Sequence, residues 1–215
     1  MRTQIRDLIL TNRLRPGQAI VIDRLAAELG VSHTPVREAL AMLQHDGLVQ
    51  MRPYGNPIVA EVTEADVCEA WEMRMLLEGW VVRKAALTLT DEDLKIVEGG
   101  LDLARADARH SRYDSHFRAD ALFHDTIMRS TEHKLFNRLS QIVSDQSTRI
   151  RWLVESIAPA DEVLTIINEH YAILRALQAR QPEQAYEQLV AHLRAGMGRT
   201  LSALKAMHED ENEEE

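Results

Sequence analysis

The sequence predicts a mainly α-helical protein, in which an N-terminal winged helix-turn-helix precedes an antiparallel bundle of six helices. Two observations favour helices: glycine, proline and aromatic residues are scarce among the 215 residues, and apolar side chains recur at helical spacing. A single β-compatible region, near residues 48–61, interrupts that spacing. With 45% hydrophobic and 27% charged residues the chain can bury a core, and its length corresponds to about two domains.

The composition also excludes several classes of protein. The single cysteine, Cys68, rules out a disulfide scaffold and a cysteine-rich zinc finger. No apolar run approaches the roughly 18 residues that a membrane span needs, and the first residues lack the pattern of a signal peptide. We therefore expect a cytoplasmic protein with no membrane partner.

The charges divide the chain into three parts. Residues 1–62 hold seven Arg and six acids, a net charge of +1, whereas residues 63–215 hold 18 Lys and Arg and 28 acids, a net charge of −10. Six of those acids lie in residues 209–215, which we expect to be a disordered tail. We accordingly predict a first domain at 1–62, a helical domain at 63–208 and an acidic tail.

The first domain begins with three short helices. One spans Thr3 to about Leu10, and a turn signal at residues 15–17 follows it. The second stops at Gly30, and Ser32 or Thr34 can cap the third, which continues to about Gly47. Two short helices joined by a tight turn that contains glycine are typical of a helix-turn-helix.

A hairpin follows, in which residues 48–51 and 58–61 flank a loop rich in turn formers. Such a hairpin is the wing of a winged helix, although any small helical domain could contain one. His33, Thr34 and Arg37 face away from the apolar stripe of the third helix, and they are donors that can read base edges and phosphates. This pattern favours binding to double-stranded DNA.

The segment GVSHTPVREALAMLQHDGLV closely resembles the recognition segment of GntR-type winged helix-turn-helix repressors. The resemblance implies that side chains of the recognition helix and of the wing contact operator DNA: Ser32, His33, Thr34 and Arg37 from the helix, and Arg52, Tyr54 and Gly55 from the wing. His33 stands where the family usually has an arginine, and a neutral imidazole cannot grip guanine with two hydrogen bonds as a guanidinium can. The wing also lacks the basic residue that the family usually carries there.

Six helices joined by short links account for the rest of the chain, as in an antiparallel bundle. Their expected ranges are residues 64–86, 91–108, 112–130, 132–156, 161–179 and 181–207. Thr63 and Thr90 are the expected caps of the first two helices.

Several polar side chains lie on faces that should point into this bundle. Asp120 and His124 share one helical face, and His170 and His192 lie among apolar residues of two later helices. Each of these side chains could be a hydrogen-bonded core residue, because an unpaired buried polar group costs several kcal/mol. Together they could instead hold one divalent cation, with zinc or nickel as first choices and manganese or iron(II) as further ones. His110, His116 and His208 are expected to face solvent.

This part of the chain is similar to the FCD ligand-binding domain of the FadR branch of the same family. The strings DALFHDTIMRS, EHYAILRAL, LVAHLRAGM and MRMLLE match its signatures. The resemblance implies that Asp120, His124, His170 and His192 are the metal ligands, and that water or a small carboxylate effector takes the open positions. Six helices point to the VanR-like group of the branch.

A carboxylate bound at the metal would need a second anchor. The candidates are Arg149 and Arg74, because a guanidinium can grip a carboxylate with two hydrogen bonds. An ion pair with an acid on a neighbouring helix is the alternative for Arg149. For Arg74 we favour a structural pair with an acid near the domain junction.

The leading hypothesis is a homodimeric transcriptional repressor rather than an enzyme. Two recognition helices must meet successive major grooves, which a two-fold dimer achieves. Two alternatives remain: a metal-dependent enzyme fused to a DNA-binding module, and a regulator that senses the metal itself. Against the enzyme stands the lack of an evident general base or nucleophile.

Overall fold

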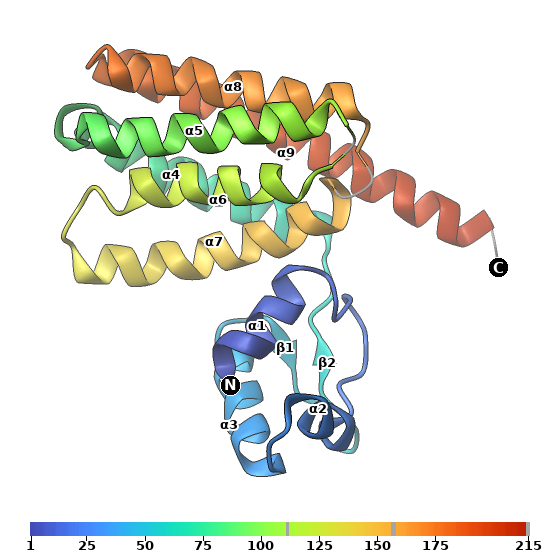
Figure 1. The fold of residues 1–215 in the computed structure, drawn as a ribbon. Coiled ribbons are helices and arrows are strands. Elements are labelled where there is room, and N and C mark those ends of the chain that lie inside the picture. The colour runs from blue at the N-terminus through green and yellow to red at the C-terminus, as the bar shows by residue number, and fades with distance from the viewer. Residues whose placement is uncertain (111, 156–157, 214–215) are drawn as a thin grey trace.

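The computed structural model describes residues 1–110, 112–155 and 158–213, which fold into two bodies (Figure 1). The smaller body contains three helices and a two-stranded sheet: α1 (Arg2–Leu10), α2 (Ile22–Leu29), α3 (His33–His45), β1 (Val49–Gln50) and β2 (Ile58–Val59). The larger body contains six helices: α4 (Glu64–Thr88), α5 (Asp91–Ala108), α6 (Asp114–Met128), α7 (Lys134–Glu155), α8 (Ala160–Gln178) and α9 (Pro182–Glu213). The predicted fold class is confirmed.

The small body is a winged helix-turn-helix. α2 ends because Gly30 adopts a left-handed backbone with a φ of +67°, and α3 starts three residues later, after its N-cap Ser32. The strands pair antiparallel, with Val49 opposite Val59. Residues 17–20 add backbone hydrogen bonds along the other edge of β2, so the wing rests on three chain segments. This body has a hydrophobic core of its own.

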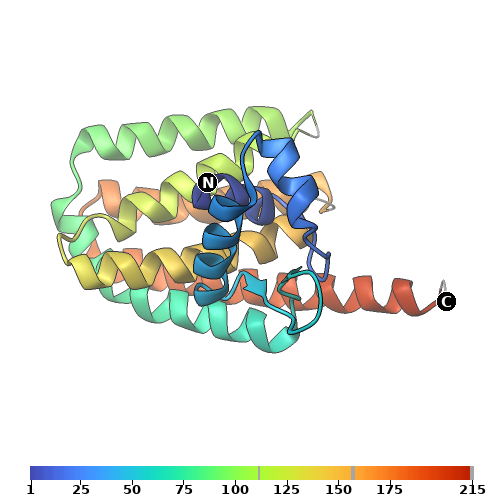
Figure 2. The same cartoon turned by 90° about the horizontal axis from the view of Figure 1, so that it is seen from below.

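The large body is a bundle of long helices whose core is separate from that of the small body (Figures 1 and 2). Both expected caps are present: the side chains of Thr63 and Thr90 each accept a hydrogen bond from the backbone N–H of an aspartate three residues later, and the carboxylate of that aspartate accepts one from the backbone N–H of the cap. α4 lies against α9 along most of its length, and it also contacts α6, α7 and α8. α4 therefore lies at the centre of the bundle's packing.

The helix ends differ from the expected ones chiefly at the C-terminus. α9 continues to Glu213, past the expected end near residue 207 and into the segment that we expected to be disordered. Glutamate and alanine are good helix formers, so an acidic sequence can prolong a helix that tertiary packing has already started. The expected end of the fourth bundle helix at residue 156, and the last two residues of the tail, lie outside the described residues.

α7 joins the two bodies. Arg6 of α1 donates two hydrogen bonds to the buried Asp145, at 2.5 and 2.6 Å. Gln146 donates one to the Asp46 carbonyl at 2.7 Å, beside Gly47, where a Cβ atom would come within 3.1 Å of the Gln146 amide. Gly47 also has a φ of +74°. A larger residue is therefore disfavoured there both by this left-handed backbone and by the close approach of Gln146. These contacts hold the small body against one face of α7.

Because the two cores are separate, damage to one should leave the other intact. We expect Leu40→Ala to cost about 2–5 kcal/mol, since Leu40 is fully buried in the small core. Hydrogen exchange followed by mass spectrometry should show lost protection in residues 2–59 only. In the matched variant Ile167→Ala, the amides that lose protection should instead be those of the bundle, because Ile167 lies in the bundle core. If either variant lowered protection equally in both bodies, the two bodies would unfold as one unit.

Candidate metal centre and DNA-reading surface

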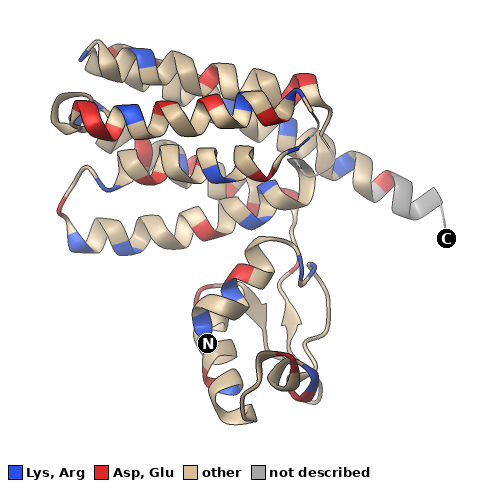
Figure 3. Ribbon diagram, in the orientation of Figure 1, with Lys and Arg blue, Asp and Glu red and all other residues tan. Residues whose placement is uncertain are grey.

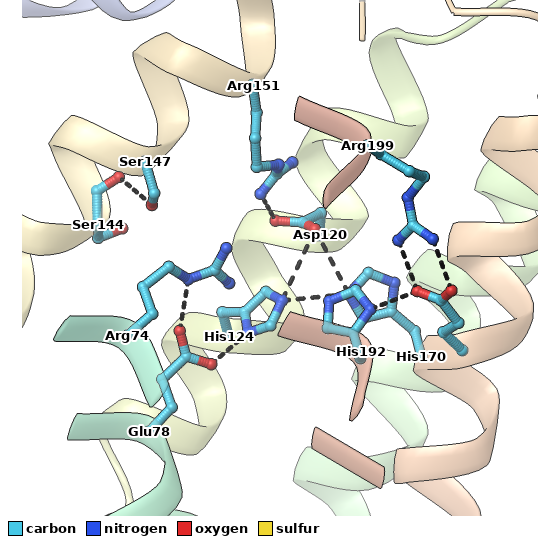
Figure 4. Close-up of polar contacts among 11 residues, drawn as sticks. Arg74, Glu78, Asp120, His124, Ser144, Ser147, Arg151, His170, His192 and Arg199 are labelled. Carbon is cyan, nitrogen blue, oxygen red and sulfur yellow. Dashed lines mark hydrogen bonds and ion pairs between the residues drawn. The ribbon is translucent and has the colours of Figure 1, made fainter. Parts of the chain in front are cut away.

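The four expected ligands meet inside the bundle (Figure 4). Asp120 and His124 come from α6, His170 from α8 and His192 from α9, and all four are buried. One ligand atom from each lies within 4.8 Å of the others. Helical spacing brings the first pair together, but the convergence of three helices is a result of the tertiary fold.

The imidazoles present their Nε2 atoms to the centre of this cluster. The Nε2 atoms of His124 and His170 are 3.2 Å apart, and the His170 Nε2 lies 3.4 Å from the Asp120 carboxylate. A gap of this size between nitrogen and oxygen donors is bridged by a cation that each of them contacts at about 2 Å. The donor set therefore fits a divalent cation.

Two glutamates orient these rings. His124 Nδ1 donates to Glu78 at 2.5 Å, and His192 Nδ1 donates to Glu169 at 2.8 Å. Each glutamate is held in turn by an arginine: Arg74 bonds Glu78 at 2.7 Å, and Arg199 bonds both oxygens of Glu169 at 2.8 Å. Carboxylates that accept the second ring proton fix the tautomer of a metal-binding histidine.

The charges of the cluster also suit a cation. Burial and the neighbouring His192 lower the pKa of His170 to about 3, so its imidazole is neutral at pH 7 and keeps a lone pair. Burial alone would raise the pKa of Asp120, but Arg151, His124 and His170 hold it well below its usual range. Burial likewise opposes the ionisation of Glu78, yet Arg74 and His124 lower its pKa to about 2. The cluster thus offers anionic carboxylates and the neutral imidazole of His170.

A polar cavity of about 250 Å³ opens beside the cluster. Asp120 and His124 form one wall, and the side chains of α7 form the opposite one. From α7 come Ser144, Ser147 and Arg151, and Arg151 also pairs with Asp120 (Figure 4). A guanidinium and hydroxyl groups facing a metal site suit a small anion.

The two expected carboxylate anchors have different outcomes. Arg74 lines the cavity, and its expected pair with an acid exists, but the partner is Glu78 beside the cluster and not an acid at the domain junction. Arg149 lies away from the cavity: its guanidinium donates to the carbonyls of Ala60 and Glu61, at 2.8 and 3.4 Å, and to Gln146. Arg149 thus holds the linker between the two bodies. In the described part of the chain it forms no ion pair with a neighbouring acid, which was the alternative role.

Sequence reasoning missed Arg151, Glu78 and Glu169 as parts of the site. A weak signal existed for the glutamates, because Glu78 follows Arg74 by one helical turn and Glu169 precedes His170. His116, which we expected to face solvent, is buried, and its ring lies 5.5 Å from that of Phe117.

The expected DNA-reading side chains lie on the surface of the small body. Those of the recognition helix surround the N-terminus of α3, and those of the wing lie in the loop between β1 and β2. All are exposed: Ser32, His33, Thr34, Arg37, Arg52, Tyr54 and Gly55. His33 Nε2 lies 3.4 Å from Asp23 of α2, so an acidic group accompanies the residue that replaces the usual arginine.

Comparisons with known proteins agree with this architecture. Residues 2–55 match the family "Bacterial regulatory proteins, gntR family", and residues 69–195 match the FCD domain. The chain is 30% identical over 195 residues to an HTH-type transcriptional regulator from an unstable DNA locus of Streptomyces ambofaciens, covering 89% of this chain and 80% of that one. It is 25% identical over 184 residues to the gluconate operon transcriptional repressor of Bacillus subtilis, covering 82% and 74%.

Solved structures share the fold. McbR/YncC of E. coli superposes with a TM-score of 0.84 at 21% identity, covering 94% of this chain and 95% of that one. The Zn²⁺-bound FCD domain of the regulator TM0439 superposes with a TM-score of 0.56 at 20% identity, covering 67% and 98%.

The fold and these matches define a class: a DNA-binding transcriptional regulator with a helical sensor domain. The chain belongs to the GntR family, in the branch that carries an FCD domain. None of the helices in the described part of the chain has the length and apolar character needed to cross a bilayer.

The hydrogen bonds that the ligand rings donate to the glutamates predict a measurable effect. Glu169→Gln should weaken divalent cation binding by about 10–100-fold, because the amide supports His192 less well than a carboxylate does. Titration calorimetry of chelator-stripped protein with Zn²⁺ measures this. His110→Ala, an exposed histidine outside the cluster, is the control and should bind as the wild type does; equal affinity of Glu169→Gln would remove Glu169 from the site.

Proposed function

We propose that this protein is a cytoplasmic homodimeric repressor whose operator affinity is set by a small carboxylate bound at a metal in the FCD domain. The observation that carries the proposal is the buried cluster of one aspartate and three histidines, together with the polar cavity beside it. An enzyme is the less favoured alternative, since the named relatives are regulators.

Asp120, His124, His170 and His192 are the proposed ligands of a divalent metal, with zinc or nickel as first choices and manganese or iron(II) as further ones. Three imidazoles and one carboxylate suit these ions better than calcium or magnesium. The Zn²⁺ bound to the FCD domain of TM0439 supports zinc. When bound, such an ion supplies a Lewis-acidic position for a carboxylate oxygen.

Arg151 is the proposed second anchor of the effector, in place of Arg149. It is buried, it lines the cavity, and it lies on the wall that faces the metal ligands. Ser144 and Ser147 add hydroxyl groups, while Arg74 adds positive charge on the side of α4. A small carboxylate could thus contact the metal with one oxygen and the α7 wall with the other.

α7 offers a direct route from this cavity to the DNA-binding body. Gln141 lines the cavity and donates to Asp145 at 2.8 Å, and Asp145 accepts both hydrogen bonds from Arg6 of α1. An effector that displaces α7 or Gln141 would therefore change the hydrogen bonds by which Asp145 binds Arg6 of α1. A preference of about 1–3 kcal/mol for one arrangement would alter operator affinity by about 5–150-fold.

DNA recognition is proposed for the exposed residues around the start of α3 and in the wing. Arg37 is the strongest candidate, because its guanidinium can bind a guanine edge or a phosphate. The two recognition helices of a homodimer would read half-sites about 34 Å apart.

Arg37→Ala should reduce specific operator binding by at least about tenfold, since a bidentate contact to a base contributes about 1–3 kcal/mol. The operator is first selected from a randomised DNA library with the wild-type protein, and affinity is then measured by fluorescence anisotropy at several salt concentrations. Metal content and the far-UV circular dichroism spectrum should not change. Unaltered affinity of Arg37→Ala would contradict the assigned recognition surface.

Arg151→Gln should weaken binding of a small carboxylate by about 10–100-fold, because a hydrogen bond to a charged group contributes about 1.5–3 kcal/mol. Thermal shift of the Zn²⁺-loaded protein with a panel of carboxylates, beginning with gluconate, identifies the probe, and calorimetry gives the affinity.

Arg149→Gln is the matched control, because Arg149 is equally buried on the same helix but lies away from the cavity. It should keep carboxylate affinity. The same loss in both variants, or in neither, would remove Arg151 as the anchor, and operator binding that follows Zn²⁺ with no carboxylate would favour a direct metal sensor.

A further inference from the structure

A second cavity lies in the bundle, apart from the polar one beside the proposed metal ligands. It has a volume of about 220 Å³, and it lies where the end of α7, the start of α8 and the second half of α9 meet. Its described lining residues differ from those of the polar cavity. Most of them are apolar, including Val154, Ile166, Ala203 and Met207. We call this cavity the apolar pocket.

The apolar pocket lies one helical turn from the candidate metal centre. On α8, the pocket residue Ile166 precedes the proposed ligand His170 by four positions. On α9, the pocket residue Gly196 follows the proposed ligand His192 by four positions. Residues four apart on a helix lie on the same face. The pocket and the metal centre are therefore successive layers between the same two helices.

Arg199 connects these two layers. Its side chain lines the pocket, and its two terminal nitrogens donate to the two oxygens of Glu169 at 2.8 Å each (Figure 4). Glu169 in turn accepts a hydrogen bond from Nδ1 of His192 at 2.8 Å. A change in the position of Arg199 would therefore reach a proposed metal ligand through a single carboxylate.

The third nitrogen of Arg199 is unpaired. Its Nε atom is buried, and among the described residues it has no hydrogen-bond partner. A buried donor without a partner is rare, because it has lost its hydrogen bonds to water and gained none in return. Since Nε is covered, an acceptor in the pocket reaches it only when the guanidinium turns. Such a turn would disturb the two hydrogen bonds to Glu169 and so weaken the support of His192.

The charges around the apolar pocket disfavour an ionised ligand. The positive charge of Arg199 is balanced by Glu169, and the half-buried Glu162 adds a carboxylate that would repel an anion. Between residues 196 and 207, α9 carries two charged residues, Arg199 and the exposed Lys205 (Figure 3). An apolar lining also penalises a charged group. The pocket therefore suits an uncharged molecule.

The volume of the pocket limits the size of that molecule. An apolar cavity of about 150 Å³ is large enough for a benzene ring. A cavity of about 220 Å³ therefore has room for one ring with a short substituent, roughly nine non-hydrogen atoms in all. A carbonyl oxygen on the substituent would supply the acceptor that the Nε atom of Arg199 lacks.

We propose that the apolar pocket is a second ligand site, which takes an uncharged ring-sized molecule with one carbonyl group and weakens cation binding when it is filled. The site itself does not depend on the metal, whereas its coupling rests on the proposed ligand His192. By linkage, the cation weakens binding of the uncharged molecule by the same factor. The regulator would thus respond to two chemical classes of ligand, an anion at the polar cavity and an apolar molecule here.

Methyl NMR of the full, chelator-stripped chain tests the site with acetophenone, an uncharged ring of this size with one carbonyl group. The methyl signals of Ile166 should shift, with a dissociation constant of about 1 mM for so small a ligand. Benzoate, which has the same size and a negative charge, should not displace it. Ala203→Leu fills the pocket and should weaken binding at least about tenfold. Ala195→Leu, the same change at an exposed position of α9 outside the pocket, is the matched control.

Three results would contradict the site. Acetophenone at about 10 mM that shifts no signal of the wild-type pocket would overturn it. Binding to Ala203→Leu as tight as to the wild type would also overturn it. Displacement of acetophenone by benzoate would overturn the assignment to an uncharged ligand.

Titration calorimetry with Zn²⁺ tests the coupling separately. Saturating acetophenone should weaken Zn²⁺ binding to the wild type at least about fivefold and leave Ala203→Leu unaffected. Equal Zn²⁺ affinity of the wild type with and without acetophenone would overturn the coupling while the site stands. If the wild type binds acetophenone but no Zn²⁺, the proposed metal centre and the coupling are both wrong, and the pocket alone remains.

Discussion

The burial of one carboxylate and three imidazoles in a helical bundle is the constraint on which the rest of the structure depends. Left unpaired, such groups would cost several kcal/mol each. The chain compensates with an outer layer of charge, in which Arg74 and Glu78 support His124, Arg199 and Glu169 support His192, and Arg151 faces Asp120. Five of the six bundle helices, α4, α6, α7, α8 and α9, contribute to this arrangement, so the bundle is organised around a polar centre. The cavity beside this centre has the Arg151 guanidinium on one wall and two of the proposed metal ligands, Asp120 and His124, on the other.

α7 connects every functional surface of the molecule. One side of it lines the cavity with Ser144, Ser147 and Arg151. Another side holds the DNA-binding body through Asp145 and Arg149. Its outer side carries the exposed Leu135 and Leu139. Because one helix borders both the cavity and the DNA-binding body, a displacement at the first can reach the second, which suits a regulator.

The fold could be predicted because local patterns define it, whereas the proposed metal ligands were indicated by the resemblance to the FCD domain rather than by spacing alone. Helical periodicity, caps such as Thr63 and Thr90, and turn glycines such as Gly30 act within a few residues of themselves. The effector anchor could not be predicted in this way. Arg149 and Arg151 are two residues apart and so point about 200° apart around the helix axis. Only the packing of α7 decides which of them reaches the cavity and which reaches the linker.

The sequence by itself determined the two-domain architecture, the family resemblance, and the residue types that suit a cation and a DNA surface. Asp120 and His192 are 72 residues apart in the sequence. Only the tertiary structure decided that they and the two histidines between them, from three helices in all, place ligand atoms within 4.8 Å of one another. It also decided which glutamates orient them and that α9 extends to Glu213. The physical reason is that helix periodicity specifies a face, while the neighbour of that face depends on how all the helices pack together.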